Sequence, residues 1–250
     1  MDKKVINKNY INSLRIYSIN KNSTIFIDDN DLIKMPEIRE DIKNSNLERS
    51  FLYDLDKNIE HIASISGEHY VLPKYSLYMS KIFSLNYKGY GMDFLKDYRK
   101  LSSLIEDNSY NFKDRIYLCK TLCDAIIKLE KYKIAYWDLH SDNILINDKN
   151  IKICDMDSIV SHKVSGYIEY KKTLMWSYKH LSLLLLSILY GIDDIEFLDV
   201  IKNNKDNKFI KDSKMFKRVI DNSYYMFYPD KYLDSFTEDY IEDTKLLLKR

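Results

Sequence analysis

Hydrophobic and polar positions alternate along the first part of the chain in a way that is typical of β-strands. Three short runs show this pattern, and polar connections separate them: Leu14–Ile19, Thr24–Ile27 and Asp31–Met35. In the third run the alternation places Leu32 and Lys34 on the same face of a strand. The simplest interpretation is three antiparallel strands in sequence.

The next stretch predicts one helix and two further strands. Pro36 ends the third strand, and Leu47, Phe51 and Leu55 then recur at spacings of four. This spacing predicts a helix over Leu47–Leu55 with one apolar face. Two later runs are predicted to be strands: His69–Leu72, and Ser76–Met79 together with Ile82 and Phe83.

Helical patterns dominate the remainder of the chain. Phe112–Lys131 repeats apolar residues at three and four, and Trp176–Tyr190 is apolar on most sides and is followed by Gly191, a suitable helix stop. The segment from Ser158 to Met175 is expected to be irregular. Three smaller amphipathic helices are predicted at the end: Ile195–Ile201, Ser213–Ile220 and Tyr240–Lys249. The predicted class is α+β, with a small antiparallel sheet and one main helix in residues 1–92 and a larger, mostly helical part in residues 93–250.

Composition and charge exclude several kinds of protein. The chain has 250 residues, of which 45% are hydrophobic and 31% charged, which is ordinary for a globular protein. Lys and Arg number 39 against 38 Asp and Glu, a formal net charge of +1. No global field therefore favours nucleic acid or an anionic membrane, and we expect neither as a partner, although a local basic patch is compatible with this balance.

Cysteine usage and hydropathy bear on the compartment. The three cysteines, Cys119, Cys123 and Cys154, include no C-x-x-C pair, and buried thiols are a better interpretation of Cys119 and Cys123 than metal ligands. The N-terminus has no apolar core of signal-peptide length. Leu181–Leu189, the most apolar run, is far shorter than the roughly 20 residues that cross a bilayer. We expect a soluble cytoplasmic protein.

The candidate chemistry is concentrated in Ile134–Ser158. This stretch contains two short β-type runs, Asn143–Ile146 and Ile151–Cys154, which directly follow the long Phe112–Lys131 helix pattern and its connection. Oxygen ligands near strand ends suit a divalent cation and a phosphate. Four residues of this kind lie here: Asp138, Asn143, Asp155 and Asp157.

These residues resemble the signature of the protein-kinase-like superfamily. Tyr136-Trp137-Asp138-Leu139 stands where the family has His-Arg-Asp-Leu, and Asn143 follows Asp138 by five positions, the family interval. Asp155-Met156-Asp157 stands where the family has Asp-Phe-Gly, twelve positions after Asn143. The resemblance implies a two-lobed protein-kinase-like fold, in which the sheet and its helix form the small lobe and the helical part forms the large lobe.

The resemblance extends to the first part of the chain. Lys34 matches the lysine that binds the α and β phosphates of ATP, and Glu48 matches the helix glutamate that holds this lysine. Glu48 follows Lys34 by 14 positions, which is short for the family, whereas the alternative Glu60 follows by 26, which is long. Tyr90–Leu95 is similar to the segment that links the lobes, whose backbone would bind adenine near Asp93 and Leu95.

The resemblance also implies a role for each remaining residue of the motif. Asp138 would orient and deprotonate the acceptor hydroxyl, and Asn143 and Asp155 would hold Mg²⁺. Trp176–Gly191 is similar to the central helix of the large lobe. ATP and Mg²⁺ are thus the implied nucleotide and metal, and the match covers most of residues 14–191.

Four departures from the family pattern bear on activity and substrate. Ser18–Ser23 offers small polar residues where the family has a glycine-rich loop, so close approach to phosphate is harder. His140 stands where serine/threonine protein kinases carry Lys and where small-molecule phosphotransferases often carry His. Asp157 replaces Gly, as a second metal carboxylate or as a turn residue. The segment from Ser158 to Met175 is short and lacks Ala-Pro-Glu.

Three functional hypotheses follow from these matches and departures. The first is a serine/threonine protein kinase of bacterial or phage type, which the pattern LPKYSLY…GYGMDFL favours. The second is a small-molecule phosphotransferase of the aminoglycoside or choline kinase type, acting on a small hydroxylated molecule. The third is a pseudokinase, which would bind nucleotide or a partner protein without phosphoryl transfer.

Overall fold

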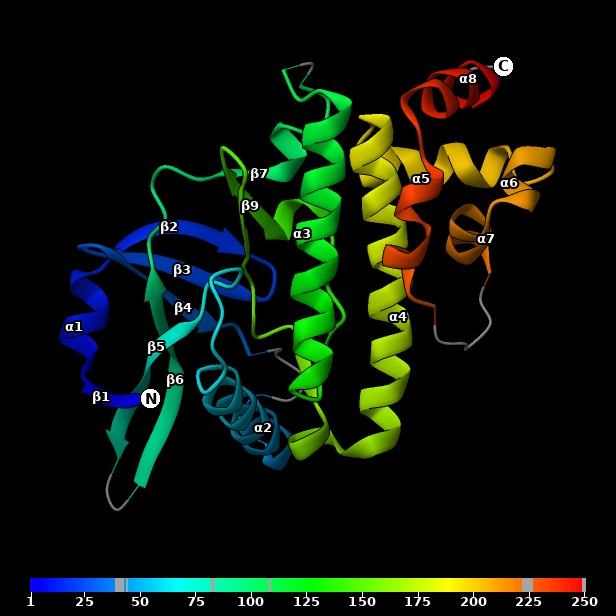
Figure 1. The fold of residues 1–250 in the computed structure, drawn as a ribbon. Coiled ribbons are helices and arrows are strands. Elements are labelled where there is room, and N and C mark those ends of the chain that lie inside the picture. The colour runs from blue at the N-terminus through cyan, green and yellow to red at the C-terminus, as the bar shows by residue number, and fades with distance from the viewer. Residues whose placement is uncertain (39–42, 44, 82–83, 108, 222–226, 249–250) are drawn as a thin grey trace. The chain divides into compact units, whose positions relative to one another are not determined.

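The computed structural model describes residues 1–38, 43, 45–81, 84–107, 109–221 and 227–248 (Figure 1). Packing divides the chain into two compact units, residues 1–96 with 155–157 and residues 97–154 with 158–250. Helices and strands are both abundant, and the α+β class predicted from the sequence is confirmed. The predicted domains 1–92 and 93–250 stay a prediction, and a single boundary does not capture the return of residues 155–157 to the first unit.

The first unit is built on a six-stranded sheet with the order β1-β5-β6-β4-β3-β2. Of the five pairs of neighbouring strands, four are antiparallel, and β1 runs parallel to β5. The sheet is therefore mixed, and the prediction of an antiparallel sheet is wrong in this respect. Sequence patterns missed β1 because only Ile6 in it is buried, which leaves no alternation to detect. The strands are β1 (Asp2–Ile6), β2 (Arg15–Asn20), β3 (Ser23–Asp28), β4 (Asp31–Pro36), β5 (Pro73–Lys81) and β6 (Ser84–Asp93).

The three strands predicted at β2, β3 and β4 are confirmed, with antiparallel pairing throughout. Asp29 has φ of 56°, the left-handed conformation that a tight turn between β3 and β4 demands. Ile33 and Leu77 belong to the buried cluster on one side of the sheet, together with Ile6. The short helix α1 (Lys8–Ser13) contributes Tyr10 and Ile11 to the edge of this cluster.

The helix predicted from Leu47 forms and extends beyond Leu55, but only the second half of its apolar face is buried. Helix α2 runs over Asn46–Ile62 and begins at Ser45, whose side chain accepts a hydrogen bond from the Glu48 backbone N–H. Leu47 is 65% exposed and Phe51 45% exposed, so only Leu55 of the predicted face is buried. The buried residues come from the second half of the helix: Leu55, Asn58, Ile59 and Ile62.

Strands β5 and β6 differ in detail from the sequence prediction. His69–Leu72 is not a strand, because β5 begins at Pro73 and only Tyr70 before it forms a bridge. Ile82 and Phe83 lie outside the described residues. In β6, a Cβ on Gly89 would lie 2.1 Å from the backbone oxygen of Lys34, so only glycine permits this close approach of β6 to β4.

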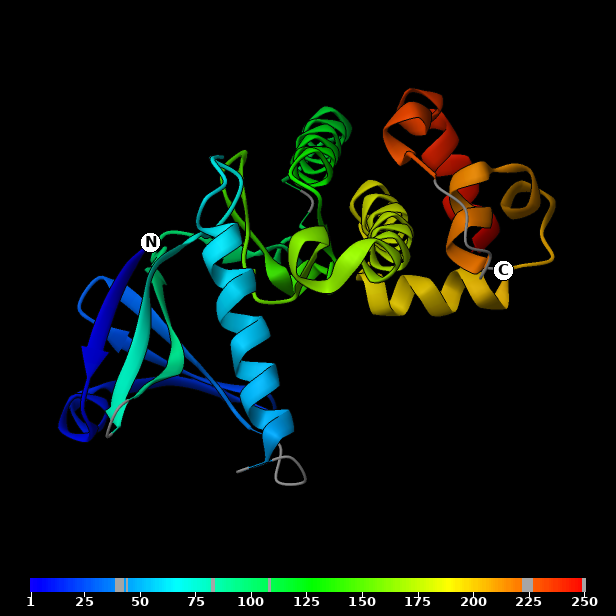
Figure 2. The ribbon, with the colours of Figure 1, turned by 90° about the horizontal axis from the view of Figure 1, so that it is seen from below.

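The second unit contains two long helices packed side by side, α3 (Phe112–Lys131) and α4 (His162–Tyr190) (Figures 1 and 2). Helix α3 has the predicted bounds, and Gly191 ends α4 in the left-handed conformation, as predicted. The segment expected to be irregular instead holds β11 (Ile159–Ser161) and the start of α4, with a kink where Gly166 has non-helical φ and ψ. Because α4 begins before Trp176 in a stretch of mixed polarity, periodicity alone did not reveal its first turns.

Short strands in this unit carry the candidate chemistry. Strand β8 pairs with β11, and β9 lies between β10 and β7 in a three-stranded sheet. The two β-type runs predicted after Asp138 correspond to β9 and β10 and are confirmed. The bounds are β7 (Arg99–Lys100), η1 (Leu101–Ser103), β8 (Ile134–Tyr136), η2 (Ser141–Asn143), β9 (Ile144–Asn147) and β10 (Asn150–Ile153).

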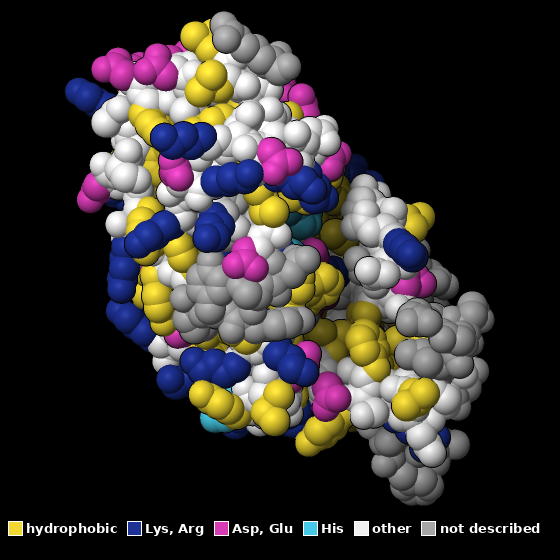
Figure 3. Space-filling model, turned by 90° about the vertical axis from the view of Figure 1, so that its right-hand side faces the viewer, with side chains coloured by type: hydrophobic (Ala, Val, Ile, Leu, Met, Phe, Trp, Pro, Cys, Tyr) yellow, Lys and Arg dark blue, Asp and Glu magenta, His cyan; other side chains and the backbone are white. Residues whose placement is uncertain are grey.

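Smaller helices complete the second unit, near the positions predicted for them. They are α5 (Asp194–Asn203), α6 (Lys208–Asp212), α7 (Lys214–Ile220), η3 (Pro229–Ser235) and α8 (Glu238–Leu248). Figure 3 looks onto the side on which α6 and α7 lie, where Lys and Arg side chains are interspersed with hydrophobic ones. Exposed lysines recur at every third position of the sequence from α5 to α7: Lys202, Lys205, Lys208, Lys211, Lys214 and Lys217. Within the described residues, no helix combines the length and apolar character that a bilayer crossing needs.

Candidate active site

The loop that carries Asp138 is fixed at its start by two hydroxyl groups. Tyr136, at the end of β8, is buried and donates from its phenol oxygen to the backbone oxygen of Cys154 at 3.0 Å. Ser177 of α4 is also buried, and its Oγ donates to the Tyr136 backbone oxygen at 2.6 Å. Buried backbone groups that keep their hydrogen bonds hold a rigid position, so Asp138 begins from a fixed point.

The end of the same loop is fixed by a buried carboxylate that sequence analysis did not single out. Asp194, at the start of α5, accepts hydrogen bonds from the Ser141 Oγ at 2.6 Å and from the Ser141 backbone N–H at 3.3 Å. Both residues are buried. Nothing in the local sequence distinguishes Asp194 from its neighbour Asp193, and only the fold brings it to the loop.

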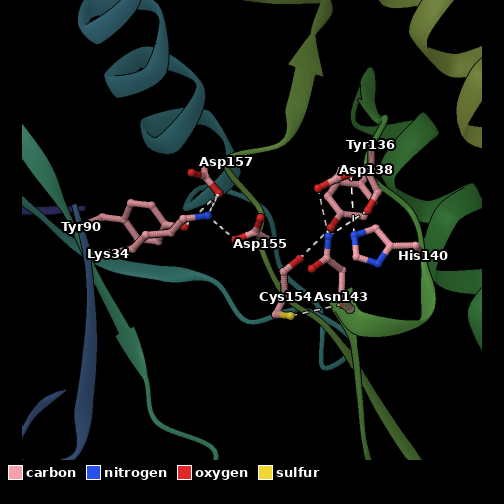
Figure 4. A network of polar contacts seen from close by, with 9 residues as sticks. All are labelled: Lys34, Tyr90, Tyr136, Asp138, His140, Asn143, Cys154, Asp155 and Asp157. Carbon is pink, nitrogen blue, oxygen red and sulfur yellow. Dashed lines mark hydrogen bonds and ion pairs between the residues drawn. The ribbon is translucent and has the colours of Figure 1, made fainter. Parts of the chain in front are cut away.

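Asn143 orients Asp138 directly. The Asn143 Nδ2 donates to the Asp138 backbone oxygen at 2.9 Å and to its Oδ2 at 3.2 Å (Figure 4). The backbone of Asn143 is anchored in turn, because its oxygen accepts from the Cys154 backbone N–H at 2.9 Å. The spacing of five positions therefore places the side-chain amide of Asn143 beside the carboxylate of Asp138.

His140 is the second neighbour of Asp138. Its Nε2 lies 3.7 Å from the Asp138 Oδ1, and both side chains are about one third exposed. The interaction with His140 lowers the pKa of Asp138 below its ordinary value, and the same interaction raises the pKa of His140. Asp138 thus carries its negative charge beside His140 over a wider pH range than an isolated aspartate does.

Two further residues, His180 and Asp142, lie near this loop and differ in their exposure to solvent. His180 of α4 is partly buried, which lowers its pKa, and it is hydrogen-bonded to the backbone of Trp137. Asp142 instead lies on the surface, where its carboxylate accepts from the Ser102 Oγ at 2.5 Å and pairs with Lys100 at 3.5 Å. These contacts of Asp142 run to Ser102 and Lys100 rather than to Asp138. Asp142 is therefore a suitable control for substitutions of Asp138.

Lys34 lies in a separate cluster, within the first unit. Its Nζ pairs with Asp155 and, at 2.8 Å, with the Oδ1 of Asp157, and its side chain is only 7% exposed. Tyr90 donates from its phenol oxygen to the same Asp157 oxygen at 3.2 Å (Figure 4). Burial alone would lower the pKa of Lys34, but the charges of Asp157 and Asp155 outweigh burial and raise it. Lys34 is therefore a charged lysine at neutral pH.

Three other predicted residues of the first unit do not join this cluster. The ion pairs of Lys34 run to Asp155 and Asp157 rather than to Glu48, which lines a pocket of about 440 Å³ with Asp56 and other residues. Asp93 ends β6 and pairs with Lys74 at 3.0 Å. Leu95 follows in the connection, and the adenine contact predicted near it stays a prediction.

Metal binding was predicted at Asn143 and Asp155. Among the described residues, no group of three or more His, Cys, Asp or Glu side chains is arranged to hold a metal ion. Asn143 belongs to the second unit and Asp155 to the first, where it faces Lys34 with its backbone in the left-handed region at φ of 57°. Such a conformation is uncommon for most residues other than glycine, and Asp adopts it more readily than most, as Asp29 and Asp148 also do.

Comparisons with known proteins add no identification to this geometry. Neither a protein-family model nor a curated protein matches the chain. The assignment of a function thus depends on the residues themselves. Sequence analysis named Asp138, His140, Asn143, Lys34 and Asp155, but it missed Tyr90, whose partner Asp157 lies 67 positions away.

Proposed function

We propose that the protein is an ATP- and Mg²⁺-dependent kinase that transfers the γ-phosphate of ATP to a hydroxyl acceptor. The proposal includes the two-lobed protein-kinase-like arrangement that the sequence resembles. A serine or threonine of a protein is the acceptor class we propose first, because of the resemblance of the small-lobe pattern to bacterial protein kinases. A small hydroxylated molecule is the alternative that His140 favours.

One observation carries the proposal, namely the environment of Asp138. Its carboxylate is oriented by Asn143 Nδ2, interacts with His140, which lowers its pKa, and is supported by a loop that is tied at Tyr136 and Ser141. Phosphoryl transfer requires positioning of the acceptor more than covalent chemistry by the protein, and this loop is built for positioning.

The proposed step assigns one role to each group. The acceptor hydroxyl donates a hydrogen bond to Asp138, its oxygen forms the new bond to the γ-phosphorus, and its proton passes to the Asp138 carboxylate. The bond from the γ-phosphorus to the bridging oxygen breaks, and ADP leaves with that oxygen. Lys34, as a buried and charged lysine, is suited to the α and β phosphates.

The proposed Mg²⁺ ligands are Asn143 and Asp155. Because Asn143 donates from Nδ2 to Asp138, its Oδ1 remains the atom for a metal, and amide and carboxylate oxygens are the hard ligands that Mg²⁺ prefers. When bound, the ion would neutralise phosphate charge. Asp155 would exchange its pair with Lys34 for the metal, which its accessible side chain permits at 30% exposure.

The experiment that tests this function is phosphoryl transfer from radiolabelled ATP by the full chain. Acceptors are the protein itself, generic protein substrates and small alcohols, with Mg²⁺ present or replaced by a chelator. Asp138→Asn is expected to lower kcat by about 10²–10⁴-fold, since it removes the base but keeps the shape of the side chain. Asp142→Asn is the matched control, because it changes an exposed carboxylate of the same loop, and its kcat should equal that of the wild type.

Two outcomes would overturn the kinase proposal. The first is absence of transfer to every acceptor class, and the second is transfer by Asp138→Asn at the wild-type rate. A thermal-shift titration then separates the remaining hypotheses. A rise in Tm with ATP that does not depend on Mg²⁺, together with no transfer, indicates a nucleotide-binding pseudokinase.

A further inference from the structure

Lys34 and Tyr90 are neighbours by the register of the sheet. The two residues face each other across β4 and β6, so their side chains leave the same face of the sheet. Gly89, next to Tyr90, permits β6 to approach the Lys34 backbone closely. The fold thus places an ammonium and a phenol side by side, with Asp157 opposite both of them.

Asp157 accepts from both of these groups through a single oxygen. Its Oδ1 lies 2.8 Å from Lys34 Nζ and 3.2 Å from the Tyr90 phenol oxygen. The Tyr90 side chain is fully buried, and Asp157 is its hydrogen-bond partner among the described residues. A buried phenol requires a partner, so the bond from Tyr90 fixes where the Asp157 carboxylate lies.

Charge balance explains why Lys34 needs a second carboxylate. Burial of an ammonium without a partner is costly, and Lys34 is almost fully buried. If Asp155 is engaged by a metal, as the proposed function requires, Asp157 remains as the carboxylate that faces Lys34. Glu48 does not face Lys34 in this way, because the ion pairs of Lys34 run to Asp155 and Asp157.

We propose that Asp157, itself held by Tyr90, is the residue that positions Lys34 for the phosphates of ATP. This inference is based on the proposed kinase function, and it gives Asp157 a positioning role instead of the metal or turn role that the sequence left open. It also explains why an aspartate stands at this position, because glycine could not bond to Lys34 or to Tyr90.

The first test measures the amine of Lys34 and needs no catalysis. The full chain is acylated with an amine-reactive reagent between pH 8 and 11, and modification of Lys34 is quantified by mass spectrometry. Asp157→Asn should move the pH profile of Lys34 to lower pH, because the amide keeps the bond to Tyr90 but lacks the charge. For each pH unit by which the midpoint of the Lys34 profile falls, the reactive neutral fraction of Lys34 rises about tenfold at a fixed pH below the pKa.

Two further variants make this test specific. Tyr90→Phe should move the Lys34 profile in the same direction by less, because Asp157 keeps its charge but loses its anchor. Glu48→Gln should leave the Lys34 profile in place. The pH profile distinguishes loss of charge from mere opening of the cluster, since greater access raises the rate at every pH without moving the midpoint.

The second test uses ATP kinetics and separates positioning from metal binding. Asp157→Asn and Tyr90→Phe should both raise KM for ATP, and the Mg²⁺ concentration for half-maximal activity should stay unchanged in both. A raised Mg²⁺ requirement in Asp157→Asn alone would show that Asp157 is a metal ligand and would overturn the inference. An unmoved Lys34 profile in Asp157→Asn would overturn it as well.

Failure of this inference and failure of the proposed function give different results. If the wild type transfers no phosphate but Asp157→Asn moves the Lys34 profile, the kinase proposal is wrong and the positioning of Lys34 by Asp157 stands. If the wild type transfers phosphate and Glu48→Gln, not Asp157→Asn, moves the profile, the function stands and the positioning residue is Glu48.

Discussion

Asp138 and Lys34 are held in place by two different kinds of interaction. The Asp138 loop is tied by hydrogen bonds from the hydroxyls of Tyr136, Ser177 and Ser141, with Asp194 as a buried acceptor. Lys34 is held by its charge, through Asp155 and Asp157. The hydroxyl and amide donors of the loop carry no charge, whereas Lys34 is held as a cation, so its ion pairs are lost when it deprotonates at alkaline pH and can be exchanged for a charged ligand.

This difference suits the roles that we propose for the two groups. An acceptor-orienting carboxylate must keep its geometry through every turnover, and a loop with buried, satisfied hydrogen bonds resists rearrangement. A phosphate-binding lysine must exchange partners when nucleotide arrives and leaves. The predictions below test whether the Asp138 loop is in fact the rigid element and whether the Lys34 cluster is in fact the electrostatic one.

The largest effect on stability is expected at Asp194. Asp194→Ala would leave the buried Ser141 Oγ and backbone N–H without an acceptor, and we expect a loss of about 2–4 kcal/mol in the free energy of unfolding. Asp142→Ala removes an exposed carboxylate next to Ser141 and should cost less than about 1 kcal/mol. Urea denaturation monitored by circular dichroism measures both. Equal costs for the two variants would contradict a loop anchored by Asp194.

A smaller effect is expected from the Lys34 cluster at alkaline pH. The folded pKa of Lys34 is raised above its ordinary 10.5, so its ion pairs contribute fully below pH 10.5 and are lost as pH rises through the folded pKa. The difference in unfolding free energy between wild type and Lys34→Met should therefore shrink above pH 10.5, by at most about 1.4 kcal/mol per pH unit.

Comparison with Lys34→Met is needed because tyrosines also titrate in this range. Burial raises the pKa of Tyr87 and of Tyr90 well above 10, so ionisation of these residues in the unfolded state lowers stability above pH 10. Both proteins share this loss, and the difference between them isolates Lys34. A difference that stays constant from pH 9 to pH 11.5 would show that charge does not hold Lys34.

Sequence patterns predicted the elements that periodicity defines. Helix α3 matched its predicted bounds, because its apolar residues recur without interruption between Asn111 and Tyr132, the residues that cap it. Strand β1 and the first turns of α4 escaped prediction, since one is mostly exposed and the other contains the Gly166 kink. In α2 the spacing of four identified the apolar face, which Leu55 and Ile59 continue, but it could not show that Leu47 and Phe51 in the first half stay exposed.

The candidate site likewise contains contacts that local sequence spacing predicted and contacts that it did not. Local spacing sufficed for Asp138 and Asn143, which are five positions apart and in contact. It could not predict that Lys34 pairs with Asp157, 123 positions away, or that Ser141 bonds to Asp194, 53 positions away. Partners so distant in sequence are chosen by the packing of whole elements, and no local pattern of residues encodes them.

The smallest effect expected is a change in the titration of His140, and it tests whether charge also contributes to the Asp138 loop. The interaction with Asp138 raises the pKa of His140 above its ordinary 6.5, so this pair stabilises the fold below pH 6.5 and loses its contribution as pH rises through the raised value. Histidine ring resonances followed by NMR give this pKa. Asp138→Asn should lower the pKa of His140, and Asp142→Asn should lower it by less, because the charge of Asp142 contributes less to the raised pKa than Asp138 does. A His140 pKa at or below 6.5 in the wild type would mean that hydrogen bonds alone hold the loop, and the contrast with the Lys34 cluster would be sharper than we propose.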